Sequence, residues 1–77
     1  MNIKDLISLM NDVRKRIYSF AHQNEIEADI IIKLYNEALE NMNTFFYSVI
    51  EEVAKLKNES SNEVEEKFNK YYSNSWN

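Results

Sequence analysis

The chain of 77 residues contains no glycine and no proline. Glycine adopts positive φ without steric cost, and proline fixes the first corner of many turns. β-Hairpins, phosphate-cradling loops, the nucleophile elbow of hydrolases and EF-hand calcium loops all need glycine at defined positions. Cysteine is also absent, which removes disulfides, thiolate metal sites and a cysteine nucleophile. These absences argue against most compact enzyme scaffolds and predict an all-α protein.

The charge balance is mildly acidic, with 9 basic and 13 acidic residues and a net charge of −4. This balance weakens general attraction to nucleic acid or anionic membranes. No apolar run approaches the roughly 20 residues of a membrane-spanning helix. The first residues lack the basic region and apolar block of a signal peptide. We therefore expect a cytoplasmic protein with one domain, residues 1–77, and no membrane contact.

The first segment has an unbroken apolar repeat with alternating spacings of three and four residues. It consists of Ile3, Leu6, Met10, Val13, Ile17 and Phe20. This spacing places one apolar stripe along a helix. It predicts a helix over residues 3–22.

A second repeat is longer and wider. Its main row is Ile32, Tyr35, Leu39, Met42, Phe46, Val49, Val53 and Leu56, and flanking rows add Ile31, Ala38, Phe45 and Ile50. The two repeats are one residue out of register, and Asn24 with Glu27 has the spacing of a capping box. We therefore predict a turn near 22–24 and one long helix over 25–57 that contacts at least two partners. The alternative is a single continuous helix from Ile3 to Lys57.

A run of turn-forming residues, 58–62, separates this segment from a third apolar face. Ser60 and Glu63 repeat the capping-box spacing, which predicts a helix over 61–72 and a frayed tail over 73–77. The expected fold is a helical hairpin with a long central helix and a short third helix, in which both shorter helices run antiparallel to the central one. Their ends would meet beside Met42, Phe45 and Phe46, where Leu6, Met10, Phe68 and Tyr72 would converge. The alternative is a compact three-helix bundle with the end of the central helix protruding. We expect dimerisation into a larger helical bundle, because a chain this short buries little core. The alternative is a monomer closed by the third helix.

Few residues offer catalytic chemistry. His22 is the only histidine, and no glutamate stands three residues before it, as a di-iron bundle requires. We expect no metal and no cofactor. Arg16 precedes His22 by six residues, and this spacing resembles the Arg-x(4–6)-His motif of HEPN-type ribonucleases. The resemblance covers only residues 16–22; it implies RNA cleavage by Arg16 and His22 in an all-helical dimer.

The only basic cluster is Arg14, Lys15 and Arg16. Consecutive residues fan over about 200° of a helix, so the cluster does not form one compact phosphate clamp. A nucleic-acid-binding helical dimer that uses these three residues is the main alternative function.

The function that we favour is protein binding without catalysis, as a regulator or inhibitor. Tyrosine and tryptophan are common anchors of protein interfaces, and several lie off the main stripes or near the end of the chain. The predicted partner-binding residues are Tyr47, Glu51, Glu52, Tyr71, Tyr72 and Trp76. The partners would be a second copy of the chain and another protein. Residues with AT-rich codons (Ile, Lys, Asn, Tyr, Phe) make up 35 of the 77, which points to an AT-rich genome or to a phage, virus or other mobile element of such a host.

Overall fold

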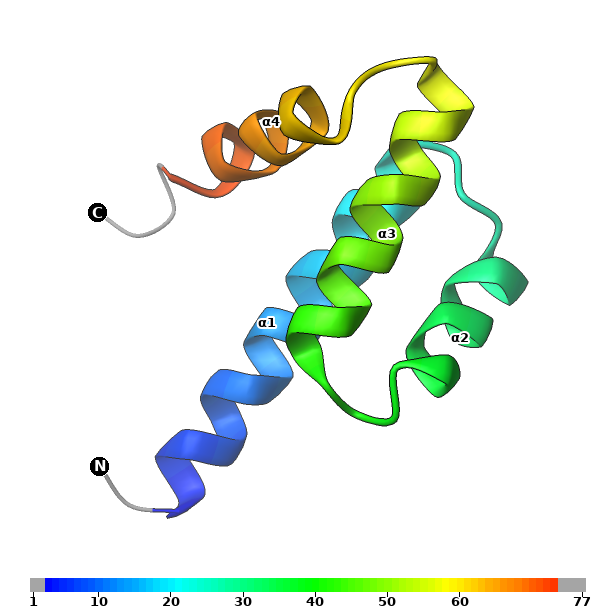
Figure 1. The fold of residues 1–77 in the computed structure, drawn as a ribbon. Helices are drawn as coiled ribbons and strands as arrows, with labels where there is room; N and C mark the ends of the chain where they lie inside the picture. Colours follow the sequence, from blue (N-terminus) through cyan, green and yellow to red (C-terminus); the bar gives the residue numbers. More distant parts are fainter. Residues whose placement is uncertain (1–2, 74–77) are drawn as a thin grey trace.

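The computed structural model describes residues 3–73, except for the side chains of 5–10, 72 and 73. These residues form four helices, which are α1 (Ile3–Gln23), α2 (Ala28–Glu37), α3 (Met42–Lys57) and α4 (Ser61–Ser73) (Figure 1). Helices α1 and α3 run in the same direction and α2 runs in the opposite one, while α4 turns away from the end of α3 (Figure 1). The described chain is therefore all-α, as predicted.

Helix α1 agrees closely with the helix predicted over 3–22. Ile17, Phe20 and Ala21 are buried in the core, and Val13 packs against it. The helix continues past the start of α3, so its first turns extend beyond the other helices (Figure 1). This extension makes the molecule longer in one direction, with extents of 41 × 30 × 17 Å.

The prediction of one long helix over 25–57 is wrong. The backbone leaves the helix after Glu37, and Leu39 and Glu40 adopt left-handed conformations with φ of 51° and 66°. Asn41 then starts α3, since its side chain accepts a hydrogen bond from the Thr44 N–H at 3.1 Å. The chain has four helices in the described region instead of the predicted three, and α3 is parallel to α1.

Burial explains why this reversal is stable without glycine. Two left-handed residues that carry a Cβ cost about 1–2 kcal/mol each. The reversal folds α3 back so that Phe45, Val49, Ile50 and Val53 are at most 1% exposed. Burying side chains of this size stabilises the fold by about 1.5–3 kcal/mol each. The burial therefore outweighs the strain of the turn.

The reversal also changes which apolar row is buried. Three members of the predicted main row, Ile32, Leu39 and Leu56, are 49%, 85% and 55% exposed. The row predicted to flank it supplies core residues instead, at Ile31, Ala38 and Phe45. The predicted central stripe is thus divided between the core and the surface.

The turn between α1 and α2 differs from the predicted capping box. Asn24 does not cap α2, and its side-chain amide donates to the Phe20 carbonyl at 2.8 Å. Glu25 follows in a left-handed conformation, with φ of 69°. The N–H groups of Glu25 and Ile26 donate to the carbonyls of His22 and Ala21, which is the Schellman pattern that ends a helix. This break also contradicts the alternative of one continuous helix over 3–57.

The start of α4 agrees with the prediction. The Ser60 hydroxyl accepts a hydrogen bond from the Glu63 N–H at 3.2 Å, and Asn58 supplies the left-handed residue that ends α3. The Phe68 ring lies 4.8 Å from Phe46 and 5.1 Å from Phe20, between ring centroids. Phe68 therefore attaches α4 to both α1 and α3. Of the side chains expected to converge beside Phe46, Phe68 does so, and those of Leu6, Met10 and Tyr72 lie outside the described residues.

Because the reversal makes Asn41 the cap of α3, it predicts that truncating this residue destabilises the fold. Asn41→Ala removes the cap on the Thr44 N–H and should lower the free energy of unfolding by about 1 kcal/mol. Asn43→Ala, two residues further on within α3, should be neutral or stabilising, because alanine favours a helix over asparagine. Urea unfolding followed by circular dichroism measures both. An uninterrupted helix would instead make both substitutions stabilising.

Candidate functional site

A groove lies between the α1–α2 loop and the first turn of α2 on one side and the last turns of α3 on the other. Its lining alternates acidic and apolar residues, which are Glu25, Ile26, Glu27, Ile30, Glu52 and Leu56. Its volume is about 190 Å³. The groove therefore combines an apolar floor with an acidic rim.

The floor of the groove follows from local structure. Ile26 is the second residue of the Schellman pattern and is only 5% exposed. Ile30 lies one turn further on, inside α2, and packs against the core. Leu56 faces them from α3 and is 55% exposed. Ile26 and Ile30 are therefore held by the core, whereas the Leu56 side chain stays open to solvent.

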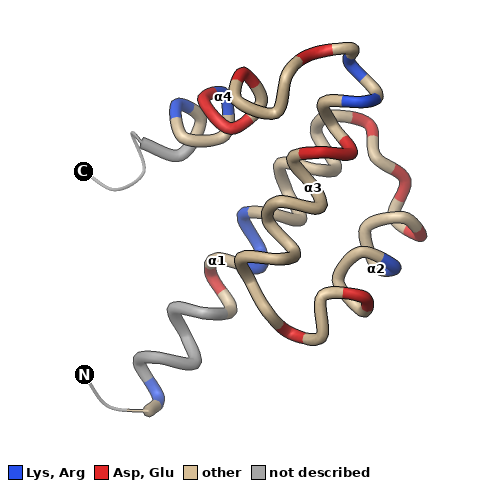
Figure 2. The backbone as a smooth tube through the Cα atoms, viewed as in Figure 1, with Lys and Arg blue, Asp and Glu red and all other residues tan. Residues whose placement is uncertain are grey.

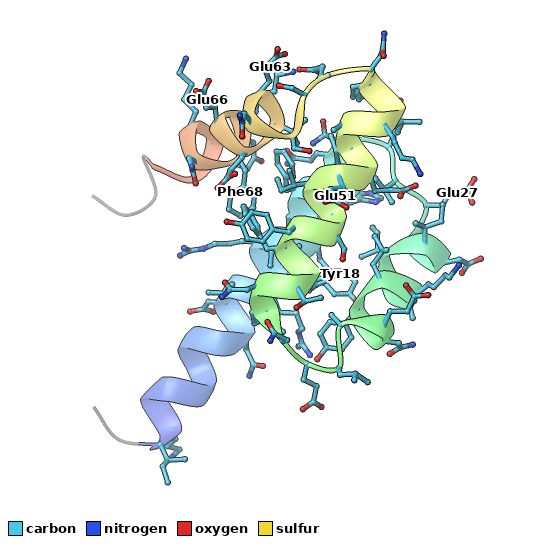
Figure 3. All side chains as sticks on the ribbon, in the orientation of Figure 1. Tyr18, Glu27, Glu51, Glu63, Glu66 and Phe68 are labelled. Carbon is cyan, nitrogen blue, oxygen red and sulfur yellow. The ribbon has the colours of Figure 1, made fainter. Side chains whose placement is uncertain are left out.

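The rim carries a surplus of negative charge. The Lys57 ammonium lies 3.7 Å from the Glu25 carboxylate. Glu27 and Glu52 have no ion pair with any residue in the described part of the chain. Acidic residues are spaced along the loop and the start of α2 (Figure 2). The Glu27 side chain projects away from the helices (Figure 3). The groove thus presents two carboxylates beside exposed apolar surface.

The size of the groove limits what it can hold. Pockets for drug-sized ligands and cofactors usually have volumes of about 300–1,000 Å³. The groove is smaller than this range. It is suited to one or two side chains of a larger partner.

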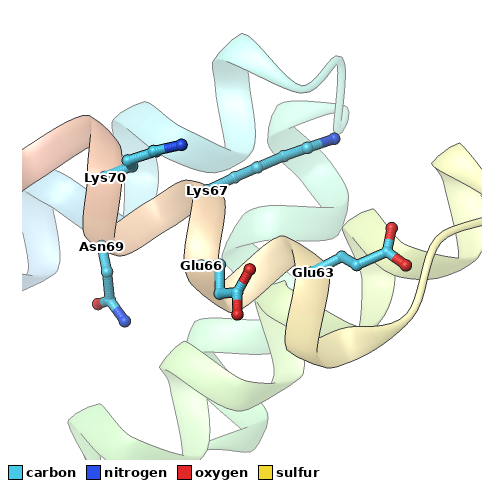
Figure 4. A pocket seen from close by; sticks show the side chains of 5 residues that line it. All are labelled: Glu63, Glu66, Lys67, Asn69 and Lys70. Atoms are coloured by element: carbon cyan, nitrogen blue, oxygen red, sulfur yellow. The ribbon is translucent and has the colours of Figure 1, made fainter.

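A larger depression of about 550 Å³ lies on α4. All its described lining residues belong to this one helix, namely Glu63, Glu66, Lys67, Asn69 and Lys70. Their side chains fan out and do not converge on a common point (Figure 4). Lys67 is paired with Glu59. No apolar side chain is among these described lining residues.

The structure divides the predicted partner-binding residues. Tyr47, which is 51% exposed, and Glu51 are one turn apart on the outer side of α3, whereas Glu52 lines the groove. Tyr71 is 50% exposed on α4, and its hydroxyl accepts a hydrogen bond from the Gln23 side chain. The Tyr72 side chain and Trp76 lie outside the described residues. The predicted set therefore does not form one surface among these residues.

The basic cluster on α1 also faces more than one direction. The Arg14 guanidinium lies 5.9 Å from the centre of the Tyr35 ring of α2. Arg14 and Lys15 line a shallow depression together with Tyr18 and Ser19, and Arg16 does not. The fan expected from consecutive helical positions is present. Binding of nucleic acid by these residues stays a prediction.

The structure does not form a catalytic site for RNA cleavage or a metal site among the described residues. Arg16 is half-buried and His22 is exposed near the end of α1. Six residues place them about 120° apart around the helix, so one copy does not bring them together. The described residues contain no group of three or more potential metal ligands. None of their helices is long and apolar enough to cross a bilayer.

Comparison with models of known protein families, with curated proteins and with solved structures finds no match to this chain. The residues and their geometry therefore carry the functional argument.

Most of the groove was not predicted as a site from the sequence. Only Glu52 was among the predicted binding residues, and Leu56 was assigned to the core. The groove joins segments about 30 positions apart, and they meet only because the chain reverses at Leu39 and Glu40. A local signal was present in Asn41, whose side chain caps α3.

The different exposure of two apolar residues of α3 predicts that their truncation lowers the free energy of unfolding by different amounts. Leu56→Ala should lower the free energy of unfolding by less than about 1 kcal/mol, because the side chain is 55% exposed. Val53→Ala should cost about 2 kcal/mol, since Val53 is 1% exposed and its truncation leaves a cavity. Urea unfolding of the two variants measures both effects. A larger loss for Leu56→Ala would place Leu56 in the core, and the groove would lose its apolar floor.

Proposed function

We propose that the protein is a small non-enzymatic interaction module that binds a partner protein through the groove between α2 and α3. It acts as a regulator or inhibitor of that partner. The observation that carries this proposal is the exposed Leu56 side chain beside the carboxylates of Glu27 and Glu52, which form no ion pair with another described residue. An apolar anchor site with a polar rim is the usual anatomy of a protein interface.

The same features argue against the main alternative at this site. Carboxylates repel the phosphates of nucleic acid, whose binding depends on lysine and arginine. The Arg14–Arg16 cluster is the place where such binding would occur, and it is a separate surface on α1. A partner protein therefore fits the groove better than a nucleic acid does. Tyr47 and Glu51, on the outer side of α3, are a proposed second contact surface.

The proposal predicts that binding of the partner protein depends on Leu56. Tagged protein incubated with a lysate of the native host should retain a specific partner, identified by mass spectrometry. Leu56→Asp should abolish this retention, because it places a charge in the apolar floor. Asn69→Asp adds the same charge to the exposed surface of α4 and should retain the partner. Recovery of the same proteins with Leu56→Asp would contradict binding at the groove.

Self-association is the second part of the proposal. The radius of gyration is 12.7 Å, whereas a compact domain of 77 residues has about 11.5 Å. The accessible surface is 5735 Å², and a monomer of 9.2 kDa typically exposes about 4,900 Å². We infer from this open shape that a second copy covers part of the surface. The extension of α1 past α3 (Figure 1) is where we place the contact between copies.

Sedimentation equilibrium tests the dimer. We expect twice the mass of one chain at micromolar concentration. Leu6→Asp with Met10→Asp, chosen from the apolar repeat of the first segment, should give one chain mass with the same helical content. A wild-type protein that sediments as one chain would contradict the dimer, and it would leave the proposal for the groove unaffected.

A further inference from the structure

The acidic rim and apolar floor of the groove specify the chemistry of the partner segment. We propose that the groove binds an amphipathic helix of the partner protein that carries lysine or arginine beside one large apolar side chain. The apolar side chain would pack against Leu56 and Ile30, and the cations would face Glu27 and Glu52. This inference rests on the proposed function, and it adds the chemical class of the partner.

Charge complementarity selects a basic segment over an acidic or neutral one. From residue 24 to the end, the chain has eleven acidic and five basic residues, whereas residues 3–23 have two acidic and four basic ones. The residues that line the groove all belong to this acidic part of the chain. Complementary charge speeds encounter with a basic segment, and like charge disfavours an acidic one.

The chain shows what kind of cation the rim accepts. Lys57 of α3 already reaches the Glu25 carboxylate at 3.7 Å, so an ammonium group lies against this rim within the molecule. Glu27 and Glu52 offer the same group without a cation from the described residues. A lysine or arginine of the partner would give them the pairing that Glu25 has.

The walls of the groove explain why the partner segment would be a helix. Beyond their end turns, helices α2 and α3 pair their backbone groups internally, and the described residues contain no strand whose edge is open. A partner strand therefore finds no strand edge to pair with here. A helix satisfies its own backbone and presents side chains three and four residues apart on one face. That spacing lets one apolar side chain enter the groove while basic neighbours reach the rim.

The test uses a fluorescein-labelled amphipathic peptide of leucine and lysine, with a matched peptide in which glutamate replaces lysine. Fluorescence anisotropy with the full chain should show binding of the lysine peptide alone. Glu27→Gln with Glu52→Gln should weaken binding by about fivefold. Glu63→Gln with Glu66→Gln removes two charges from α4 and should change binding by less than about twofold. Leu56→Asp should weaken binding by at least about tenfold.

Four results of the peptide assay would overturn the inference. They are no binding of the lysine peptide, equal binding of the glutamate peptide, equal weakening by the two pairs of glutamine variants, and binding that survives Leu56→Asp. Loss of self-association in Leu56→Asp would also overturn it, because a second copy would then occupy the groove. A different pair of results is that the lysine peptide fails to bind while the wild-type protein still retains a lysate partner that Leu56→Asp loses. This pair of results would reject the basic helix and keep the proposed function.

Discussion

The reversal of the chain between α2 and α3 is the constraint on which the rest of the structure depends. Leu39 and Glu40 take left-handed conformations there, and Asn41 restarts the helix with a side-chain cap. Because of this reversal, α3 runs alongside α1 and buries Phe45 and Val53. The same reversal brings the end of α3 to the start of α2, so the groove exists only because the chain turns here.

All the described left-handed residues in this glycine-free chain lie in turns that follow helices: Glu25, Leu39, Glu40 and Asn58. Asparagine tolerates this conformation better than glutamate or leucine does. The first and last turns are supported by Schellman hydrogen bonds. The middle turn has two adjacent left-handed residues, and packing of α3 in the core offsets their strain. The first of these turns also places Ile26 and Glu27 at the groove, so a helix-ending motif supplies part of the candidate site.

Local signals predicted much of the fold. The all-α class, helix α1 and the Ser60 cap of α4 followed from composition, spacing and capping chemistry. The break inside 25–57 did not, because apolar residues continue through it in two rows and no glycine or proline marks it. The choice between the rows depends on tertiary packing, which exposes Leu56 and buries Phe45. The other residues of the groove were not predicted as binding residues, because only tertiary packing brings them beside Glu52. The partner class and the dimer remain proposals.

The distance between residues 27 and 56 tests the reversal and the groove together. Glu27→Cys with Leu56→Cys introduces the only two thiols of the chain, so spin labels attach at these positions alone. Both residues line the groove. Pulsed electron spin resonance should therefore report a distance between the two labels well under half of the distance that an uninterrupted helix would impose. An uninterrupted helix between the two positions would separate them by about 44 Å. A distance near that value would contradict the reversal, the groove and the function proposed for it.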